Sequence, residues 1–168
     1  MFKLEILDKD WLPGQPEETD LCLHGEVRVR IDDDVLEDEV SLSATALHLL
    51  RSVTEDHELD CLAKLFPTDG FCWTPDDEGS IYLGGCPNGG IDGYVTHEGD
   101  MVCVALENLQ PVRLSLEEYQ AQVFAFADEV EAFFRQSKSK VVTTELDKLW
   151  YPCFWDEWHW RRAAAENP

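Results

Sequence analysis

Basic side chains are scarce in this sequence. Its 168 residues include 13 Lys and Arg but 35 Asp and Glu, which gives a formal net charge of −22 at pH 7. A surface with this charge repels the phosphate backbone of nucleic acids and the headgroups of anionic membranes, and it attracts basic proteins through long-range steering. We therefore expect a basic protein partner, with no direct binding to nucleic acid or to a membrane.

Signals for export, membrane insertion and disulfide formation are also missing. The N-terminus lacks a basic start followed by an uninterrupted apolar stretch, and no apolar run approaches the length of a membrane span. The six cysteines are scattered without a closely spaced pair. These absences predict a cytoplasmic protein with reduced thiols.

The apolar content is nevertheless high enough for a folded core. Hydrophobic residues make up 44% of the chain and aromatic residues 11%, so the charge does not indicate a disordered acidic tail. A chain of this length is most simply one domain. We expect a single acidic α+β domain over residues 1–168, in which a mostly antiparallel sheet meander is packed by a long amphipathic helix.

The strands of this meander are predicted from alternation and turn residues. Residues 21–31 alternate between apolar and polar side chains, which is typical of a half-buried strand. A two-residue turn at Glu98–Gly99 would pair Val95 with Val102 in a hairpin. Short β-prone segments are expected at 80–84, 91–97, 101–106 and 111–114.

Three helices are predicted, near 43–54, at about 115–137 and near 153–164. The second is the most clearly marked, because Ser115 and Glu118 form a capping box and an apolar stripe follows. The third is expected to start near Pro152. Four of the six Trp lie in residues 149–162, where they are predicted to close the core; the alternative is a platform that stacks a ligand.

The negative charge is unevenly distributed. Residues 67–110 contain eight acidic and no basic side chains, whereas residues 111–168 contain ten acidic and seven basic ones. Two local clusters stand out, one after the first long strand and one in a later turn, and either could be a solvated surface. A net charge of −22 destabilises the folded state, because like charges repel one another. A role in recognition would explain why the sequence carries so large a charge. The predicted partner-binding residues are Asp32, Asp33, Asp34, Glu37, Asp38, Glu39, Asp76, Asp77 and Glu78.

No group of residues in the sequence indicates a particular catalysed reaction. A metal site could be assembled from Cys72, Cys86, His97 and Cys103, but these residues are 14, 11 and 6 positions apart, without the close ligand pairs of structural zinc sites. Cys86 with His97 and Asp92 could form a thiol catalytic centre, but no basic residue nearby would favour the thiolate. The glycines at 84–93 lack a phosphate-binding motif and indicate tight turns. We therefore expect no enzyme, no metal and no cofactor.

Three segments resemble small acidic bacterial immunity proteins of polymorphic toxin systems. They are Val112–Tyr119, Phe126–Phe134 and Phe154–Trp158, which lie within about the last third of the chain. The resemblance implies an acidic α+β domain that inhibits a cognate toxin by blocking its active site, and it assigns no individual binding residue.

The leading hypothesis is therefore an immunity-type inhibitor that neutralises a basic partner, such as a toxin nuclease, by covering its functional surface. The alternatives are a DNA mimic or phage-encoded inhibitor of a nucleic-acid-binding protein, and a small metal- or thiol-dependent enzyme centred on Cys86 and His97.

Overall fold

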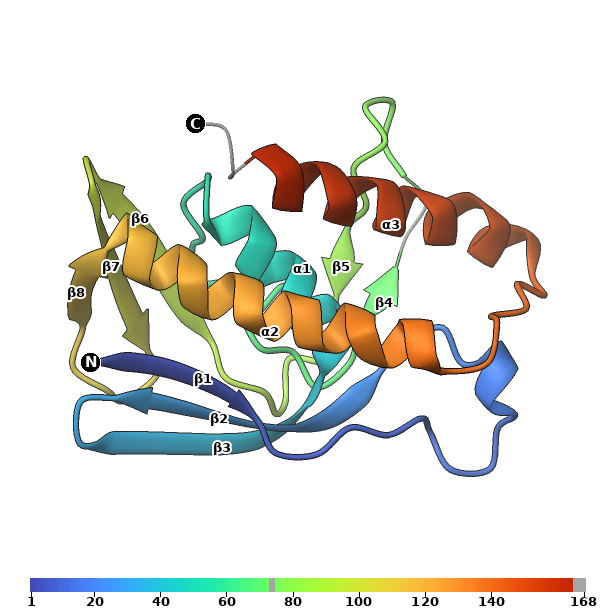
Figure 1. Ribbon diagram of the computed structural model, residues 1–168, viewed down its shortest axis with the longest axis horizontal. Helices are drawn as coiled ribbons and strands as arrows, with labels where there is room; N and C mark the ends of the chain where they lie inside the picture. Colours follow the sequence, from blue (N-terminus) through green and yellow to red (C-terminus); the bar gives the residue numbers. More distant parts are fainter. Residues whose placement is uncertain (73–74, 165–168) are drawn as a thin grey trace.

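The chain folds into three helices and three groups of antiparallel strands, which confirms the α+β class (Figure 1). The computed structural model describes residues 1–72 and 75–164, with the side chains of residues 71 and 72 outside the description. The strands are β1 (Phe2–Ile6), β2 (His24–Ile31), β3 (Asp34–Ser41), β4 (Phe71–Cys72), β5 (Leu83–Gly84), β6 (Gly93–Glu98), β7 (Met101–Leu106) and β8 (Val112–Ser115). The helices are α1 (Leu42–Ser52), α2 (Leu116–Gln136) and α3 (Glu145–Ala164).

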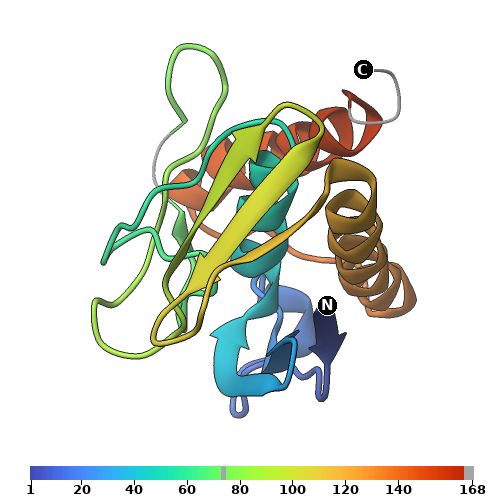
Figure 2. The ribbon, with the colours of Figure 1, turned by 90° about the vertical axis from the view of Figure 1, so that its left-hand side faces the viewer.

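The helices pack on one another and on both of the larger sheets. Strands β1, β2 and β3 form one sheet in that order, β6, β7 and β8 form another, and β4 pairs with β5. Helix α2 crosses from the first sheet to the second, while α3 lies above α1 on the side away from the first sheet (Figures 1 and 2). Residues from all three helices and both larger sheets join one continuous hydrophobic core.

Helix α1 lies at the centre of this core. Every residue of the helix except Arg51 is buried, and the Ser41 side chain caps its first turn by accepting the Ala44 N–H. A helix buried on all sides needs small or apolar residues around its whole circumference. The sequence Leu42–Leu50 meets that need, because its polar members, Ser43, Thr45 and His48, are few and compact.

The predicted β6–β7 hairpin forms with a shifted turn. The turn residues are Gly99 and Asp100, so Val95 pairs with Val104 and not with Val102. Gly99 has a φ of +65° at the first central position of the turn, which type II′ hairpin turns reserve for glycine. The shift does not change the side of the sheet that each residue faces, so Val95, Val102 and Val104 are all fully buried, as predicted.

The first sheet is larger than the sequence predicted. Residues 21–31 were expected as one strand, but β2 begins at His24 and has a neighbour on each side. The segment after it was interpreted as an acidic turn. Only Asp32 and Asp33 form that turn, and the rest of the segment is strand β3. Acidic residues are poor strand formers, and β3 forms because it pairs with β2 along its whole length.

The α2 prediction is confirmed. Ser115 accepts the Glu118 N–H and the Glu118 carboxylate accepts the Ser115 N–H, which completes the capping box. The buried stripe consists of Tyr119, Val123, Phe126, Ala127 and Val130.

The start of α3 was predicted wrongly. The helix begins at Glu145, and Pro152 lies inside it. Thr144 caps its first turn by accepting the Asp147 N–H at 3.0 Å. Burial of Trp150 and Phe154, which lie on one helical face across Pro152, offsets the hydrogen bond that proline cannot make. Trp158 is also buried, so this face is part of the core, as expected, whereas Trp155 is half-buried and Trp160 is 50% exposed.

No helix within the described ranges combines the length and apolar character needed to cross a bilayer.

Candidate protein-binding surface

The structure brings six of the nine predicted binding residues together on one hairpin. Asp32 and Asp33 form the β2–β3 turn, while Asp34, Glu37, Asp38 and Glu39 belong to β3. The other three, Asp76, Asp77 and Glu78, lie in the loop between β4 and β5. Figures 1 and 2 place this loop at the top and β3 at the bottom of the molecule. The two acidic clusters therefore do not form one surface. We call the first cluster, residues 32–39, the acidic edge.

Strand β3 lies at the free side of its sheet. The sheet order is β1-β2-β3, so β3 has a partner strand on one side only. Its register with β2 pairs Glu26 with Glu39 and Arg28 with Glu37. Arg28 Nε donates to Glu37 at 2.6 Å, whereas Asp33, Asp34 and Glu39 make no ion pair within the described part of the chain. The acidic edge therefore keeps most of its charge.

The backbone of β3 is uncovered over most of its length. Ser41 N–H points away from β2 and donates to the Pro67 carbonyl at 2.8 Å. In an antiparallel strand, residues two apart direct their backbone groups to the same side, so Val35, Glu37 and Glu39 also face outward. The Glu39 N–H is bound by the Asp38 side chain at 2.9 Å. Among the described residues, nothing binds the outward N–H groups of Val35 and Glu37.

The acidic loop between β4 and β5 has a local structural role. The Asp76 carboxylate accepts the N–H groups of Glu78 and Ser80, each at 2.9 Å. This pattern stabilises a turn by side-chain-to-backbone bonds. Asp77 and Glu78 are exposed at the tip, so this cluster is a solvated turn whose first carboxylate shapes the backbone.

The residues considered for metal or thiol chemistry serve separate parts of the fold. His97 Nδ1 contacts Asp56 at 2.8 Å and Nε2 contacts the Val53 carbonyl at 3.1 Å; the bond from His97 lowers the pKa of Asp56. Cys86 is exposed, and no hydrogen bond joins it to His97 or Asp92 in the described part of the chain. Cys103 is on β7, and the Cys72 side chain lies outside the described residues. The described residues contain no group of three ligands that could hold a metal ion.

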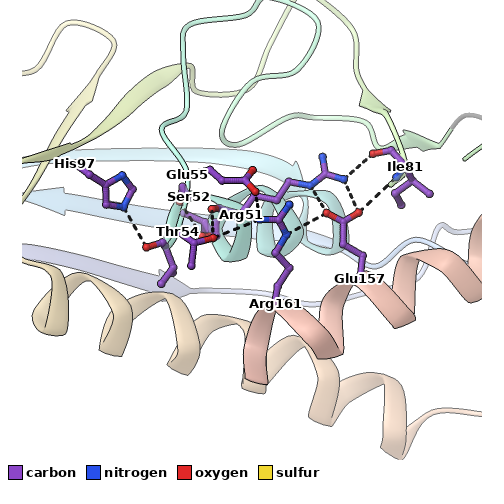
Figure 3. Close-up of polar contacts among 10 residues, drawn as sticks. Arg51, Ser52, Thr54, Glu55, Ile81, His97, Glu157 and Arg161 are labelled. Atoms are coloured by element: carbon purple, nitrogen blue, oxygen red, sulfur yellow. Dashed lines mark hydrogen bonds and ion pairs between the residues drawn. The ribbon is translucent and has the colours of Figure 1, made fainter. Parts of the chain in front are cut away.

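A buried cluster of ions joins α1 to α3 (Figure 3). Glu157 is 2% exposed and accepts two bonds from Arg51, both at 2.7 Å. Arg161 adds a third bond to the same carboxylate, at 3.3 Å. Burial alone would raise the pKa of Glu157, but the bonds and charge of Arg51, with the charge of Arg161, hold it below its usual value. We call Arg51, Glu157 and Arg161 the buried ion cluster.

A pocket beside this cluster was missed by the sequence analysis. It is lined by His48 and Arg51 of α1, by the loop residues 55–60, and by Tyr82. The sequence does contain one sign of this pocket: four acidic residues lie within six positions, Glu55, Asp56, Glu58 and Asp60. His48 and His57 also line this pocket. The sequence predicted no role for either, because no partner for these side chains can be read from the sequence.

Comparisons with protein-family models, characterised proteins and solved structures find no match to this chain.

Proposed function

We propose that this chain is a protein-binding module of the immunity type, which inhibits a basic partner such as a toxin nuclease by covering its functional surface. The observation that carries the proposal is the acidic edge, where an uncovered strand and a group of unpaired carboxylates coincide. The binding mode that fits both features is addition of an extended basic segment of the partner to β3 as a fourth strand.

The backbone of β3 supports this mode. The outward N–H and C=O groups of Val35 and Glu37 are available to a new strand, and Val35 is 43% exposed. An exposed edge strand is a template for pairing with another chain, and natural proteins protect such edges with charge. The charge here is negative along the whole segment, so a second copy of this chain would bring like charges together.

The side chains of the acidic edge select a basic segment. Glu37 and Glu39 lie two residues apart on one face of β3, and Asp34 and Asp38 lie on the other. Lys or Arg residues in a partner strand would meet carboxylates on both faces. Opposite charges steer the encounter and raise the association rate, with an effect that weakens as salt is added.

A capture experiment with the wild type and two matched variants tests the proposal. The wild-type chain is immobilised, and a lysate of the native source is passed over it. We expect a basic protein to be retained by the wild type and lost with Glu37→Gln/Glu39→Gln. The control Asp77→Asn/Glu78→Gln removes the same charge from the other acidic cluster and should retain the protein. Equal retention by all three would overturn the role of the acidic edge.

A third variant separates backbone pairing from charge. Val35→Pro removes an outward N–H and leaves every carboxylate in place, so it should weaken capture, whereas Val35→Ala should not. Circular dichroism checks that both variants fold. If DNA competes with this chain for the captured protein, the partner is a nucleic-acid-binding protein, and the chain inhibits it in the manner of a DNA mimic.

A further inference from the structure

A pocket of about 380 Å³ opens between α1 and the loop that follows it. This volume lies in the range of pockets that bind small organic molecules. Apolar contact area is supplied by Leu59, Ala63, Tyr82 and Leu83. The pocket is formed by residues outside the acidic edge, so its occupant is a separate question from the proposed strand addition.

Carboxylates dominate the charge of this pocket. Glu55, Asp56, Glu58 and Asp60 line it together with a single guanidinium, that of Arg51. Arg51 and Arg161 share the Glu157 carboxylate, and Arg161 also pairs with Glu55, so these four charges balance one another. Glu58 makes no ion pair within the described ranges, and the Asp60 carboxylate accepts only a backbone bond, from Leu62 at 2.8 Å. A cation is therefore attracted to the pocket and an anion is repelled.

Two imidazoles, one buried and one half-buried, supply unused hydrogen-bonding atoms. His48 is 4% exposed, and its ring centroid lies 5.7 Å from that of His57. The Nε2 atoms of both rings are buried and have no partner among the described residues. A buried polar atom without a partner is uncommon in folded proteins and calls for an explanation.

Both imidazoles are neutral in the folded chain. Burial lowers the pKa of His48 well below its usual value, and the positive charge of Arg51 acts in the same direction. Burial also lowers the pKa of His57, against the attraction of Asp92 and Asp60. The Leu83 backbone acts on the pKa of His48 in the opposite direction and raises it, but burial outweighs it. A neutral ring that donates from Nδ1 presents Nε2 as an acceptor.

We propose that this pocket binds an alkylguanidinium or alkylammonium group, with His48 and His57 as hydrogen-bond acceptors and the loop carboxylates balancing its charge. Both cations carry several N–H donors and no acceptor, so they complement a pocket lined by carboxylate oxygens and imidazole acceptors. A metal ion fits less well, because no three potential ligands converge in the described part of the chain. The group belongs either to a free small molecule or to a Lys or Arg side chain of a protein.

Histidine nitrogen spectra of the wild-type chain test the proposal without any substitution. The chain is labelled with ¹⁵N in its imidazoles and titrated with butylguanidinium, and separately with butylammonium. We expect saturable shifts of the Nε2 signals of His48 and His57, and none for His24 and His159, which lie outside the pocket. Absence of saturable shifts up to about 10 mM of both probes, which corresponds to an affinity weaker than about 3 kcal/mol, would overturn the proposal.

A pair of charge variants tests the role of the loop carboxylates. Glu58→Gln/Asp60→Asn keeps the shape of the pocket and should weaken butylguanidinium binding by at least about tenfold. The matched control Asp77→Asn/Glu78→Gln removes the same charge from the solvated turn between β4 and β5 and should change binding by less than about twofold. Equal weakening by both variants would show attraction to the overall charge of the chain, and would overturn the assignment of a specific pocket.

The source of the cation is decided by a third probe, an acetylated and amidated Gly-Arg-Gly peptide. Tighter binding of this peptide than of butylguanidinium indicates a protein side chain, whereas tighter binding of butylguanidinium indicates a free small molecule. Either result supports the pocket. Since the pocket and the acidic edge share no residue, failure of this proposal leaves the strand-addition experiment unaffected.

Discussion

Carboxylates have different roles in the acidic edge and in the buried ion cluster. On the acidic edge, Asp33, Asp34 and Glu39 face solvent and form no ion pair with any described residue, so their charge is available to a partner. In the buried ion cluster, Glu157 is enclosed and its charge is matched by two guanidinium groups. Burial therefore decides whether a carboxylate in this chain recognises another molecule or holds two helices together.

The largest effect is expected from breaking the buried ion cluster. Glu157→Ala removes the carboxylate that Arg51 and Arg161 share; Arg161 keeps its ion pair with Glu55, but Arg51 has no other ion-pair partner among the described residues. The free energy of unfolding should therefore fall by about 3–5 kcal/mol. Urea denaturation followed by tryptophan fluorescence measures the change. A loss below about 1 kcal/mol would show that water reaches the cluster and screens it.

The second prediction concerns pH and two histidines, His48 and His57. As the pH falls below about 6.5, the unfolded chain takes up protons on both side chains, whereas the folded chain takes them up only at lower pH, because burial lowers their pKa values. The free energy of unfolding should therefore decrease, by at most about 1.4 kcal/mol per pH unit for each group. Asp92, whose pKa is raised by burial, acts with the opposite sign at more acidic pH.

The control for this prediction is His48→Gln, which cannot titrate. Its unfolding free energy, measured by urea denaturation at pH 7.5 and at pH 5.5, should change less between the two values than that of the wild type. An identical change in the two proteins would mean that His48 has the same pKa in the folded and the unfolded chain, which contradicts the prediction.

A smaller effect is expected at the start of α2. Ser115→Ala removes the hydroxyl that accepts the Glu118 N–H, and it should lower the free energy of unfolding by about 1 kcal/mol. Ser115→Thr keeps an acceptor and should recover most of the loss. Thermal denaturation of the three proteins makes the comparison, and equal melting temperatures for wild type and Ser115→Ala would contradict it.

The smallest effect on stability is expected on the acidic edge. Asp33→Asn/Glu39→Gln should shift the melting temperature by no more than about 3 °C, because these exposed side chains make no ion pair. The shift should be upward and should shrink in high salt, since removing negative charge relieves self-repulsion. A large downward shift would show that the acidic edge holds the fold together, as the buried ion cluster does.

Elements with strong local signals were predictable from the sequence. The capping box of Ser115 and Glu118 and the stripe behind it placed α2 to within a residue at each end. Elements that depend on distant partners were not. Strand β3 is acidic and forms only because β2 pairs with it, and α3 runs through Pro152 because its aromatic face is buried on both sides of the proline.

The same division applies to the candidate sites. The six carboxylates of the acidic edge are close in sequence and were found by counting charges. Their separation from Asp76, Asp77 and Glu78 depends on the path of the chain, which places the two clusters on opposite sides (Figure 1). The pocket required the fold as well, because His48 and His57 come from α1 and from the loop after it, and Tyr82 from near β5.

By itself, the sequence determined the charge of this protein, its α+β character and the helix that follows the capping box, because each depends on composition or on residues within a few positions of one another. The tertiary structure decided which carboxylates are exposed and which are neutralised. That choice depends on the burial of Glu157 between Arg51 and Arg161 and on the uncovered side of β3, and both are set by contacts between residues far apart in the chain.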